Sequence, residues 1–263
     1  MLSICSQFAD DFDITFNSKK TVCMKFGENI NHYEKVHLNG KIISWVEKIR
    51  HLGNYLDTTL IDEIDCRSKI SAFIGYVNKL NVNFGHLRLH VISNLFKSYC
   101  CSFYGSQMWK LDSLHFNKVC TAWNIGVRRT LNLPFTSHRY FLGPIMRQPH
   151  IRFQLYKRCV RFLFGMTKCN NVIVKSCLNN AAHNANTPLG YNIAFFRSTY
   201  GFNVLHSNVR KCLNSIVSPV LSNDQSININ HLHTLLSVRS GFNHIPAFTK
   251  KDINTLIHGL TTG

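Results

Sequence analysis

Apolar residues recur every three or four positions over long stretches of the chain after residue 57, a spacing typical of amphipathic helices. The pattern predicts four helices, over residues 64–80, 87–104, 114–131 and about 149–165. Pro134 lies just beyond the third of these and indicates where it stops. Four consecutive helices of this kind suggest a helical bundle. Weaker helical patterns follow, around residues 192–205, 228–239 and 249–260.

The first 60 residues carry a different pattern, of one short helix and several short strands. Apolar positions at helical spacing predict a helix over residues 2–12, with its aspartates facing solvent. Strands are predicted over 14–16, 21–26, 36–38, 41–43 and 49–53, the last ending in a glycine turn. Asn39-Gly40 is a strong hairpin signal between the third and the fourth. The sequence therefore predicts an α+β fold that is mostly helical, with a small antiparallel sheet at residues 1–60, a helical region at 61–166 and a weakly determined helical tail at 167–263.

Charge divides the chain at nearly the same place. Residues 1–65 hold seven Lys or Arg and ten Asp or Glu, a net charge of −3, whereas residues 66–263 hold 23 bases and three acids, a net charge of +20. Between Asp112 and Asp224 there are 14 bases and no acid. Such a stretch has no internal counter-charge, so its field must be met by solvent ions or by a polyanion, of which nucleic acid is the first candidate. The alternative is an ordinary basic, solvated surface.

Cysteine usage and hydropathy exclude other classes. The ten cysteines are scattered, apart from Cys100-Cys101, and show neither a disulfide framework nor paired zinc-ligand spacing, so we expect reduced thiols and no metal site. No uncharged apolar run reaches about 18 residues, which argues against a membrane span, and no secretory signal is evident. We expect an intracellular protein, nuclear or cytoplasmic. Phosphate-loop, nucleophile-elbow and H-E-x-x-H motifs are all absent from the sequence.

Three blocks of sequence, at residues 12–26, at 36–40 with 50–57 and at 98–139, together resemble the non-LTR (LINE-type) retrotransposon reverse transcriptases. Residues 12–26, FDITFNSKKTVCMKF, are similar to motif D of that family, at the rim of the palm. Residues 36–40 followed by 50–57, RHLGNYLD, are similar to its hairpin and primer grip. Residues 98–139 are similar to the helical thumb and the segment after it. The resemblance covers roughly residues 5–145 and implies the end of a palm, a thumb and a following region.

The resemblance also implies roles for particular residues. Asn17 and Lys20 would lie near the incoming nucleotide, where a lysine can stabilise charge on the transferred phosphoryl group; the alternative for Lys20 is a solvated hairpin lysine. Arg50, His51 and Gly53 would contact strand phosphates in the primer grip; the alternative is an ordinary strand end. A basic thumb would hold a hybrid duplex by its shape and phosphates. The candidate thumb residues are Arg128, Arg129, Arg139, Arg152, Arg158 and Arg161.

Phe8-Ala9-Asp10-Asp11 imitates the catalytic aromatic-Ala-Asp-Asp box of the same family. Two-metal catalysis needs such aspartates on a tight turn between strands, with a further carboxylate from another strand. Only Phe12 separates Asp11 from the motif D block, where the family has a strand and a helix. We therefore interpret Asp10 and Asp11 as the end of a helix, and we assign no catalytic residue and no cofactor to this chain, although the complete family enzymes use Mg²⁺.

These observations predict a truncated reverse transcriptase-like chain that is inactive alone and binds RNA or an RNA–DNA hybrid without sequence preference, with no membrane and no small-molecule partner. Apolar faces that the missing palm strands would cover are expected to be exposed. Two alternatives stay open. The chain could act in polymerisation when a front half complements it, or it could be an unrelated basic helical interaction protein.

Overall fold

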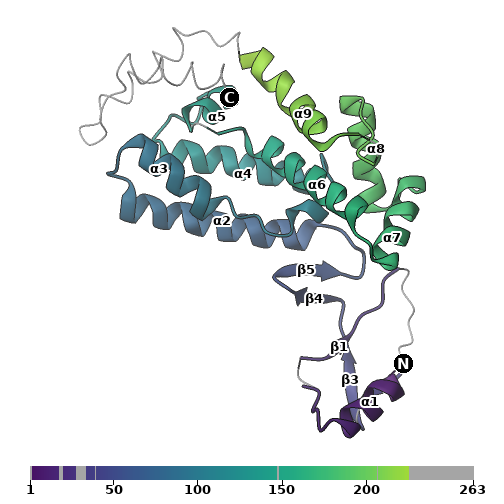
Figure 1. Cartoon of the computed structure of the whole chain (residues 1–263). Coiled ribbons are helices and arrows are strands. Elements are labelled where there is room, and N and C mark those ends of the chain that lie inside the picture. The colour runs from purple at the N-terminus through teal and green to yellow at the C-terminus, as the bar shows by residue number, and fades with distance from the viewer. Residues whose placement is uncertain are drawn as a thin grey trace. The chain divides into compact units, whose positions relative to one another are not determined.

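The computed structural model describes residues 2–17, 20–27, 34–38, 40–146, 148–205 and 207–224. The chain divides into two compact units, Met1–Asp65 and Cys66–Gly263. Helices account for 59% of the structure and strands for 9%, so the predicted α+β, mostly helical fold is confirmed (Figure 1).

The first unit contains one helix and five short strands. Its elements are α1 (Leu2–Asp11), β1 (Val22–Cys23), β2 (Val36–Leu38), β3 (Lys41–Trp45), β4 (Lys48–His51) and β5 (Asn54–Asp57). The predicted hairpin is confirmed, because β2 pairs antiparallel with β3 and Val36 lies opposite Ile43. Strand β1 joins the other edge of β3 in parallel. A second hairpin joins β4 to β5 through Leu52 and Gly53, whose positive φ angles of 46° and 83° match a two-residue type I′ turn.

The strand predicted over residues 14–16 is wrong. Asp13 has a φ of 53°, and the Ile14 N–H donates to the Ala9 carbonyl at 2.8 Å. These residues therefore fold back over the C-terminal end of α1, where they satisfy a carbonyl that the helix leaves free. The strand predicted over 21–26 is likewise reduced to Val22–Cys23.

The apolar side of α1 is largely open to solvent. Ala9 is buried, but Ile4, Phe8 and Phe12 are each more than half exposed. The Phe8 and Phe12 rings contact each other with centroids 4.5 Å apart. Apolar surface is thus exposed in the first unit.

The second unit is a helical assembly. The long helix α2 (Glu63–Phe84) leads into it from the unit boundary. The other elements are α3 (Leu89–Leu95), the π-helical turn η1 (Phe96–Cys100), the 3₁₀ turn η2 (Ser106–Met108), α4 (Leu114–Thr130), the 3₁₀ turn η3 (Arg139–Phe141), α5 (Leu142–Ile145), α6 (Ile151–Lys168), α7 (Val172–His183), α8 (Pro188–Tyr200) and α9 (Val209–Asp224). The four predicted helices correspond to α2, to α3 with η1, to α4 and to α6.

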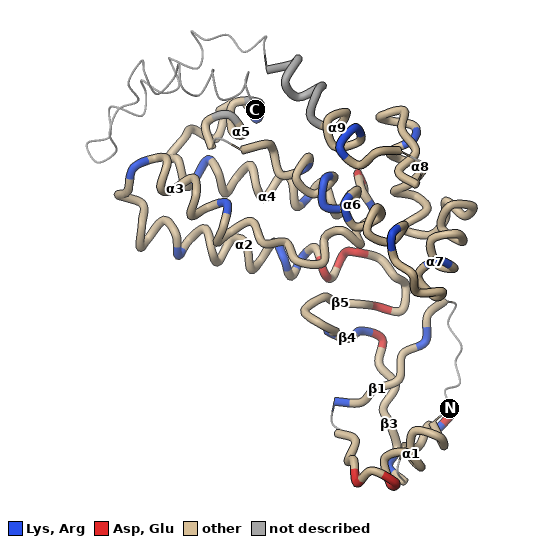
Figure 2. Tube along the Cα trace, in the orientation of Figure 1, with Lys and Arg blue, Asp and Glu red and all other residues tan. Residues whose placement is uncertain are grey.

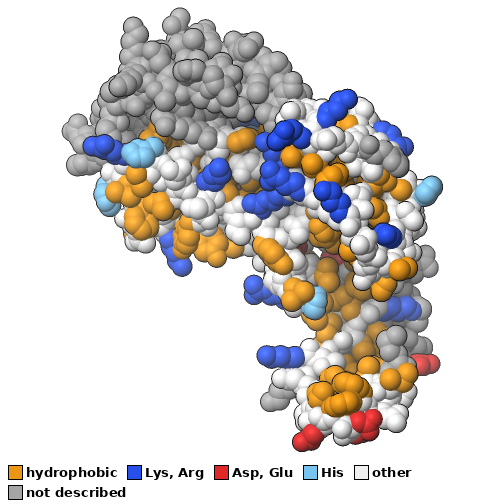
Figure 3. Space-filling view, viewed as in Figure 1, with side chains coloured by type: hydrophobic (Ala, Val, Ile, Leu, Met, Phe, Trp, Pro, Cys, Tyr) orange, Lys and Arg blue, Asp and Glu red, His pale blue; other side chains and the backbone are white. Residues whose placement is uncertain are grey.

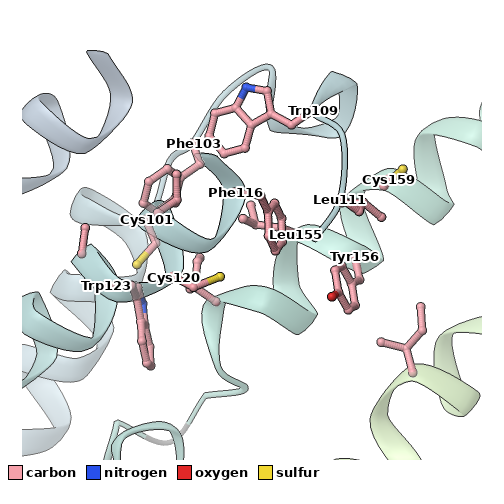
Figure 4. Packing of buried hydrophobic residues seen from close by; sticks show 14 of the residues in the cluster. Cys101, Phe103, Trp109, Leu111, Phe116, Cys120, Trp123, Leu155, Tyr156 and Cys159 are labelled. Atoms are coloured by element: carbon pink, nitrogen blue, oxygen red, sulfur yellow. The ribbon is translucent and has the colours of Figure 1, made fainter. Parts of the chain in front are cut away.

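Buried side chains from α2, α4 and α6 and from the segment between η1 and α4 form one hydrophobic core. Figure 4 shows Phe103 and Trp109 from that segment, with Phe116 and Trp123 of α4 and Tyr156 of α6. The Phe116 and Tyr156 rings stack with centroids 5.7 Å apart. Helices α7, α8 and α9 add Leu178, Ile193, Phe196 and Ile216 to the same core, so residues 167–224 belong to the unit that begins at Cys66.

One buried amide ties α8 to this core. The Asn192 side chain accepts a hydrogen bond from Leu111 N–H at 2.9 Å and donates to the Trp109 carbonyl at 2.8 Å. Because Asn192 is fully buried, removing the amide leaves both backbone groups without a partner and out of reach of water.

We therefore expect Asn192→Leu to lower the free energy of unfolding by roughly 2–4 kcal/mol. Chemical denaturation followed by circular dichroism measures the change. Asn180→Leu on α7 replaces an exposed Asn and should change stability by less than about 0.5 kcal/mol. Equal effects of the two substitutions would contradict a structural role for the Asn192 amide.

Candidate nucleic-acid interface

Helix α6 presents a row of basic side chains to solvent. Ile151, Leu155, Cys159 and Leu163 face the core. On the opposite side lie Lys157, Arg161 and Lys168, which at 100° per residue fall within an arc of about 40°. Arg161 and Lys168 are exposed and Lys157 is half-buried. We call these three residues the α6 basic row.

Local contacts position the α6 basic row. The Lys168 ammonium lies 4.7 Å from the centroid of the Phe164 ring, a cation–π geometry that holds the charge beside an aromatic face. Burial, and then the neighbouring charge of Arg161, lowers the pKa of Lys157. The three positive side chains of the row repel one another. An anionic ligand would relieve this repulsion, so the row favours binding of an anion.

Helix α9 packs against α6 and extends the basic surface. Arg210 and Lys211 lie in the first turn of α9, and both are exposed. The tube in Figure 2 carries Lys and Arg positions on both helices. On the face seen in Figure 3, Lys and Arg side chains gather over the region that α6 and α9 occupy in Figure 1.

The second unit offers almost no carboxylate to neutralise this surface. Asp112 is the single acid between residues 66 and 223, and it forms an ion pair with Arg152. Asp and Glu positions are concentrated in the first unit and at the start of α2 (Figure 2). The other bases in this stretch must be balanced by ions or ligands from outside it.

Arg152, a candidate thumb residue, is half-buried and engaged within the fold, and it does not belong to the basic row. Besides its ion pair, its guanidinium donates to the Tyr156 hydroxyl at 3.1 Å and to the Asn117 side chain. It also lies over the Phe116 ring, 5.6 Å from the centroid. These contacts tie α6 to α4 and leave Arg152 little freedom to bind a ligand.

Arg158 and Arg128 are also engaged within the fold. Arg158 donates to the carbonyls of Cys101, Ser102 and Phe103, at 2.9 Å for Cys101 and 3.1 Å for Phe103. Arg128 donates to the Ser137 carbonyl through Nε at 3.1 Å and Nη2 at 2.7 Å. Burial lowers the pKa of both guanidinium groups. Their charges stabilise loop carbonyls, which is a structural role.

The two remaining candidate arginines are both exposed. Arg129 is exposed and lines an apolar groove of about 480 Å³ between α2 and α4, with Lys118 on the same side of α4. Arg139 is exposed in η3. Arg161 is thus the one candidate arginine of the six that belongs to the α6 basic row.

In the first unit the candidate residues lie at two turns. Asn17 closes a turn, because its carbonyl accepts from the N–H of Lys20 at 3.0 Å and of Thr21 at 2.9 Å, and the Lys20 side chain is exposed. In the β4–β5 hairpin, Arg50 is exposed and lies 5.8 Å from the centroid of the Tyr55 ring opposite it. His51 ends β4 beside Gly53, which takes part in the turn.

Asp10 and Asp11 lie in the last turn of α1, and both are exposed. The prediction that they belong to a helix is confirmed. A helix end does not provide the strand–turn–strand support that a two-metal site requires. Among the residues that the structure describes, no cluster of three or more His, Cys, Asp or Glu side chains is placed to hold a metal ion.

The cysteines are all free thiols, and most are buried. Burial raises the pKa of the Cys100 and Cys101 thiols to about 12, so both stay protonated at neutral pH.

In the described parts of the chain, no helix combines the length and the apolar character needed to cross a bilayer.

The sequence interpretation missed Lys157, Lys168, Arg210 and Lys211. For the two residues on α6 the sequence did contain a signal, because positions 157, 161 and 168 share one side of a helix whose other side is apolar.

Comparisons with protein-family models, with curated proteins and with solved structures find no match to this chain.

Proposed function

We propose that the helical unit binds nucleic acid through its phosphates, without reading base sequence, on the surface formed by the α6 basic row and the first turn of α9. The observation that carries this proposal is the row itself, three cations on one side of a rigid helix in a stretch whose one acid is already paired. Phosphate contacts of this kind supply affinity without specificity.

The length of the row suits a polyanion. Lys157 and Lys168 are 11 residues apart, which corresponds to about 16 Å along the helix axis. That distance equals roughly five phosphate steps along one strand of a duplex. A small anion would engage one of these side chains, whereas a nucleic-acid backbone can engage the whole row.

The resemblance to the reverse transcriptase thumb covers residues 98–139 of the same unit and supports an RNA–DNA hybrid as the preferred form. A thumb of that family would contact a hybrid by shape and phosphates, and the α6 surface offers cations rather than a set of groups that read base edges. Under this proposal the chain corresponds to the rear part of such an enzyme, and Lys20 and Arg50 would act in polymerisation when a front half complements it.

A salt series tests the proposal. Fluorescence anisotropy would follow binding of the full chain to a labelled RNA–DNA hybrid between 50 and 200 mM salt. With about five phosphate contacts, affinity should fall by roughly 10²–10³-fold over this range, and scrambling the hybrid sequence should have little effect. Weak binding that does not respond to salt would contradict the proposal and favour an interaction protein with incidental charge.

A primer-extension assay with Mg²⁺ tests the relation to polymerisation. We expect no nucleotide incorporation by the isolated chain, because Asp10 and Asp11 lie on an exposed helix end. Incorporation would contradict our interpretation of these two residues.

A further inference from the structure

A row of exposed tyrosines and lysines lies where α2 meets the segment from η1 to Tyr104. Tyr76 is 37% exposed, Tyr99 47% and Tyr104 60%. Exposed aromatic rings are costly to leave in water, and three of them in one region mark an interaction surface. The row is distinct from the α6 basic row and contains none of the residues assigned above.

Two contacts organise these side chains. The Tyr76 and Tyr99 rings meet edge to face, with centroids 5.0 Å apart. The Lys69 ammonium lies 5.8 Å from the centroid of the Tyr104 ring. Lys69 and Tyr76 are seven residues apart, so they lie on the same side of α2 about 10 Å apart along its axis. The Lys69–Tyr104 contact and the Tyr76–Tyr99 contact therefore follow one another along the same side of α2.

The electrostatic surroundings of this row favour an anion. No acidic residue occurs between residues 66 and 111, and Lys79 on α2 and Lys97 on η1 are exposed close to the tyrosines in sequence. Glu63 and Asp65 precede Lys69 at the start of α2, and the basic residues of this surface are otherwise without acidic neighbours in the sequence. A surface that pairs exposed aromatic rings with lysines and has few carboxylates suits a ligand with alternating flat rings and negative charges.

The tyrosine row adjoins the α6 surface through Arg158. This arginine donates to the carbonyls of Cys101, Ser102 and Phe103, the residues that lead directly to Tyr104. On α6, Arg158 lies one turn from Arg161. A single strand that leaves a duplex held by the α6 basic row would thus meet Tyr104 nearby.

We propose that Tyr76, Tyr99 and Tyr104, with Lys69, form a binding site for single-stranded nucleic acid in which unpaired bases stack on the tyrosine rings. Bases in a duplex are already stacked on one another and cannot use these faces, so the site selects single strands. The inference rests on the proposed nucleic-acid binding and adds a second, chemically different contact to it.

Paired substitutions in the full chain test the site. The variant Tyr99→Leu with Tyr104→Leu keeps apolar bulk but removes the aromatic faces, whereas Tyr99→Phe with Tyr104→Phe keeps them. Affinity for a labelled 12-nucleotide oligouridine should fall about 10- to 100-fold in the Leu variant and stay within about threefold in the Phe variant. Affinity for a blunt RNA–DNA hybrid should be unchanged in both.

A measurement on the unmodified protein accompanies this comparison. An oligonucleotide that carries 2-aminopurine should lose fluorescence on binding, because stacking on a tyrosine quenches that base. Equal oligouridine affinity of the Leu and Phe variants, or no quenching, would overturn the stacking site while hybrid binding persists. Failure to bind either form would instead overturn the proposed function and the site together.

Discussion

Replacing Lys157, Arg161 and Lys168 together with Gln is expected to weaken binding to an RNA–DNA hybrid about 100-fold at 0.15 M salt. Each phosphate contact releases close to one counterion, and at this salt concentration each release raises the affinity about fivefold. Losing three contacts therefore lowers the affinity about 100-fold. The three side chains point away from the core, so the variant should keep the circular dichroism spectrum of the parent chain. Fluorescence anisotropy titrations measure the change in affinity.

A second triple variant controls for net charge. Arg88→Gln, Lys118→Gln and Arg129→Gln remove the same charge from exposed positions in the same unit, at the start of α3 and on the groove side of α4. This variant should bind the hybrid within about threefold of the parent chain. If both variants lose affinity equally, the unit's overall charge and not the α6 basic row governs binding.

Stability is expected to fall by roughly 3 kcal/mol between pH 7 and pH 4 because of one histidine, His150. Its Nδ1 accepts the Arg152 N–H at 3.2 Å and caps α6, while Nε2 lies 2.9 Å from the Asn124 side-chain oxygen. Burial, and then the charges of Arg152 and Arg139, lowers the pKa of His150 to about 3. The unfolded chain takes up a proton near pH 6.5 and the folded chain does not, so stability is complete above pH 6.5 and is lost as pH falls toward 3.

Urea denaturation at a series of pH values measures this effect. His150→Asn retains a side-chain oxygen able to cap the helix but does not titrate, and its unfolding free energy should vary much less between pH 7 and pH 4. His90→Asn on α3 removes an exposed histidine and should leave the pH dependence unchanged. A parent-like pH profile in the His150→Asn variant would show that other groups control acid stability.

Helices with a continuous apolar face were predictable from the sequence. α2, α4 and α6 each follow a clear three-to-four-residue repeat, and the Asn39-Gly40 dipeptide in the sequence predicted the hairpin that β2 and β3 form. Boundaries set by capping were also readable in principle. Thr187 caps α8 ahead of Pro188, and Gly201 ends it with a φ of 67°, although the sequence interpretation placed a helix at 192–205.

Other features depend on contacts that only the folded chain creates. The helix predicted over residues 87–104 ends at Cys100, because the next three carbonyls accept hydrogen bonds from Arg158 of α6 instead of continuing the helix. Contacts made only in the folded chain also determine which of the candidate arginines are free to bind a ligand. Arg128 and Arg152 look like free cations in the sequence, yet their partners are Ser137 and Asp112, which the fold brings to them.

The helices of residues 167–224 were the least predictable part of the described chain. α7 contributes few buried side chains, among them Leu178 and Ala181, so its apolar repeat is short. α9 contains Pro219, a residue that normally argues against a helix interior. α7 packs against α6 and α8, and α9 packs against α6. This packing, rather than local sequence preference, accounts for their helical state.

Lysine acetylation footprinting of the full chain, read by mass spectrometry with and without an RNA–DNA hybrid, tests the nucleic-acid interface most directly. Lys157 and Lys168 should be protected from acetylation by the bound hybrid, while Lys118, on the groove side of α4, should react equally in both samples. Protection of Lys118 with unchanged reaction at Lys157 and Lys168 would contradict the placement of nucleic acid on α6.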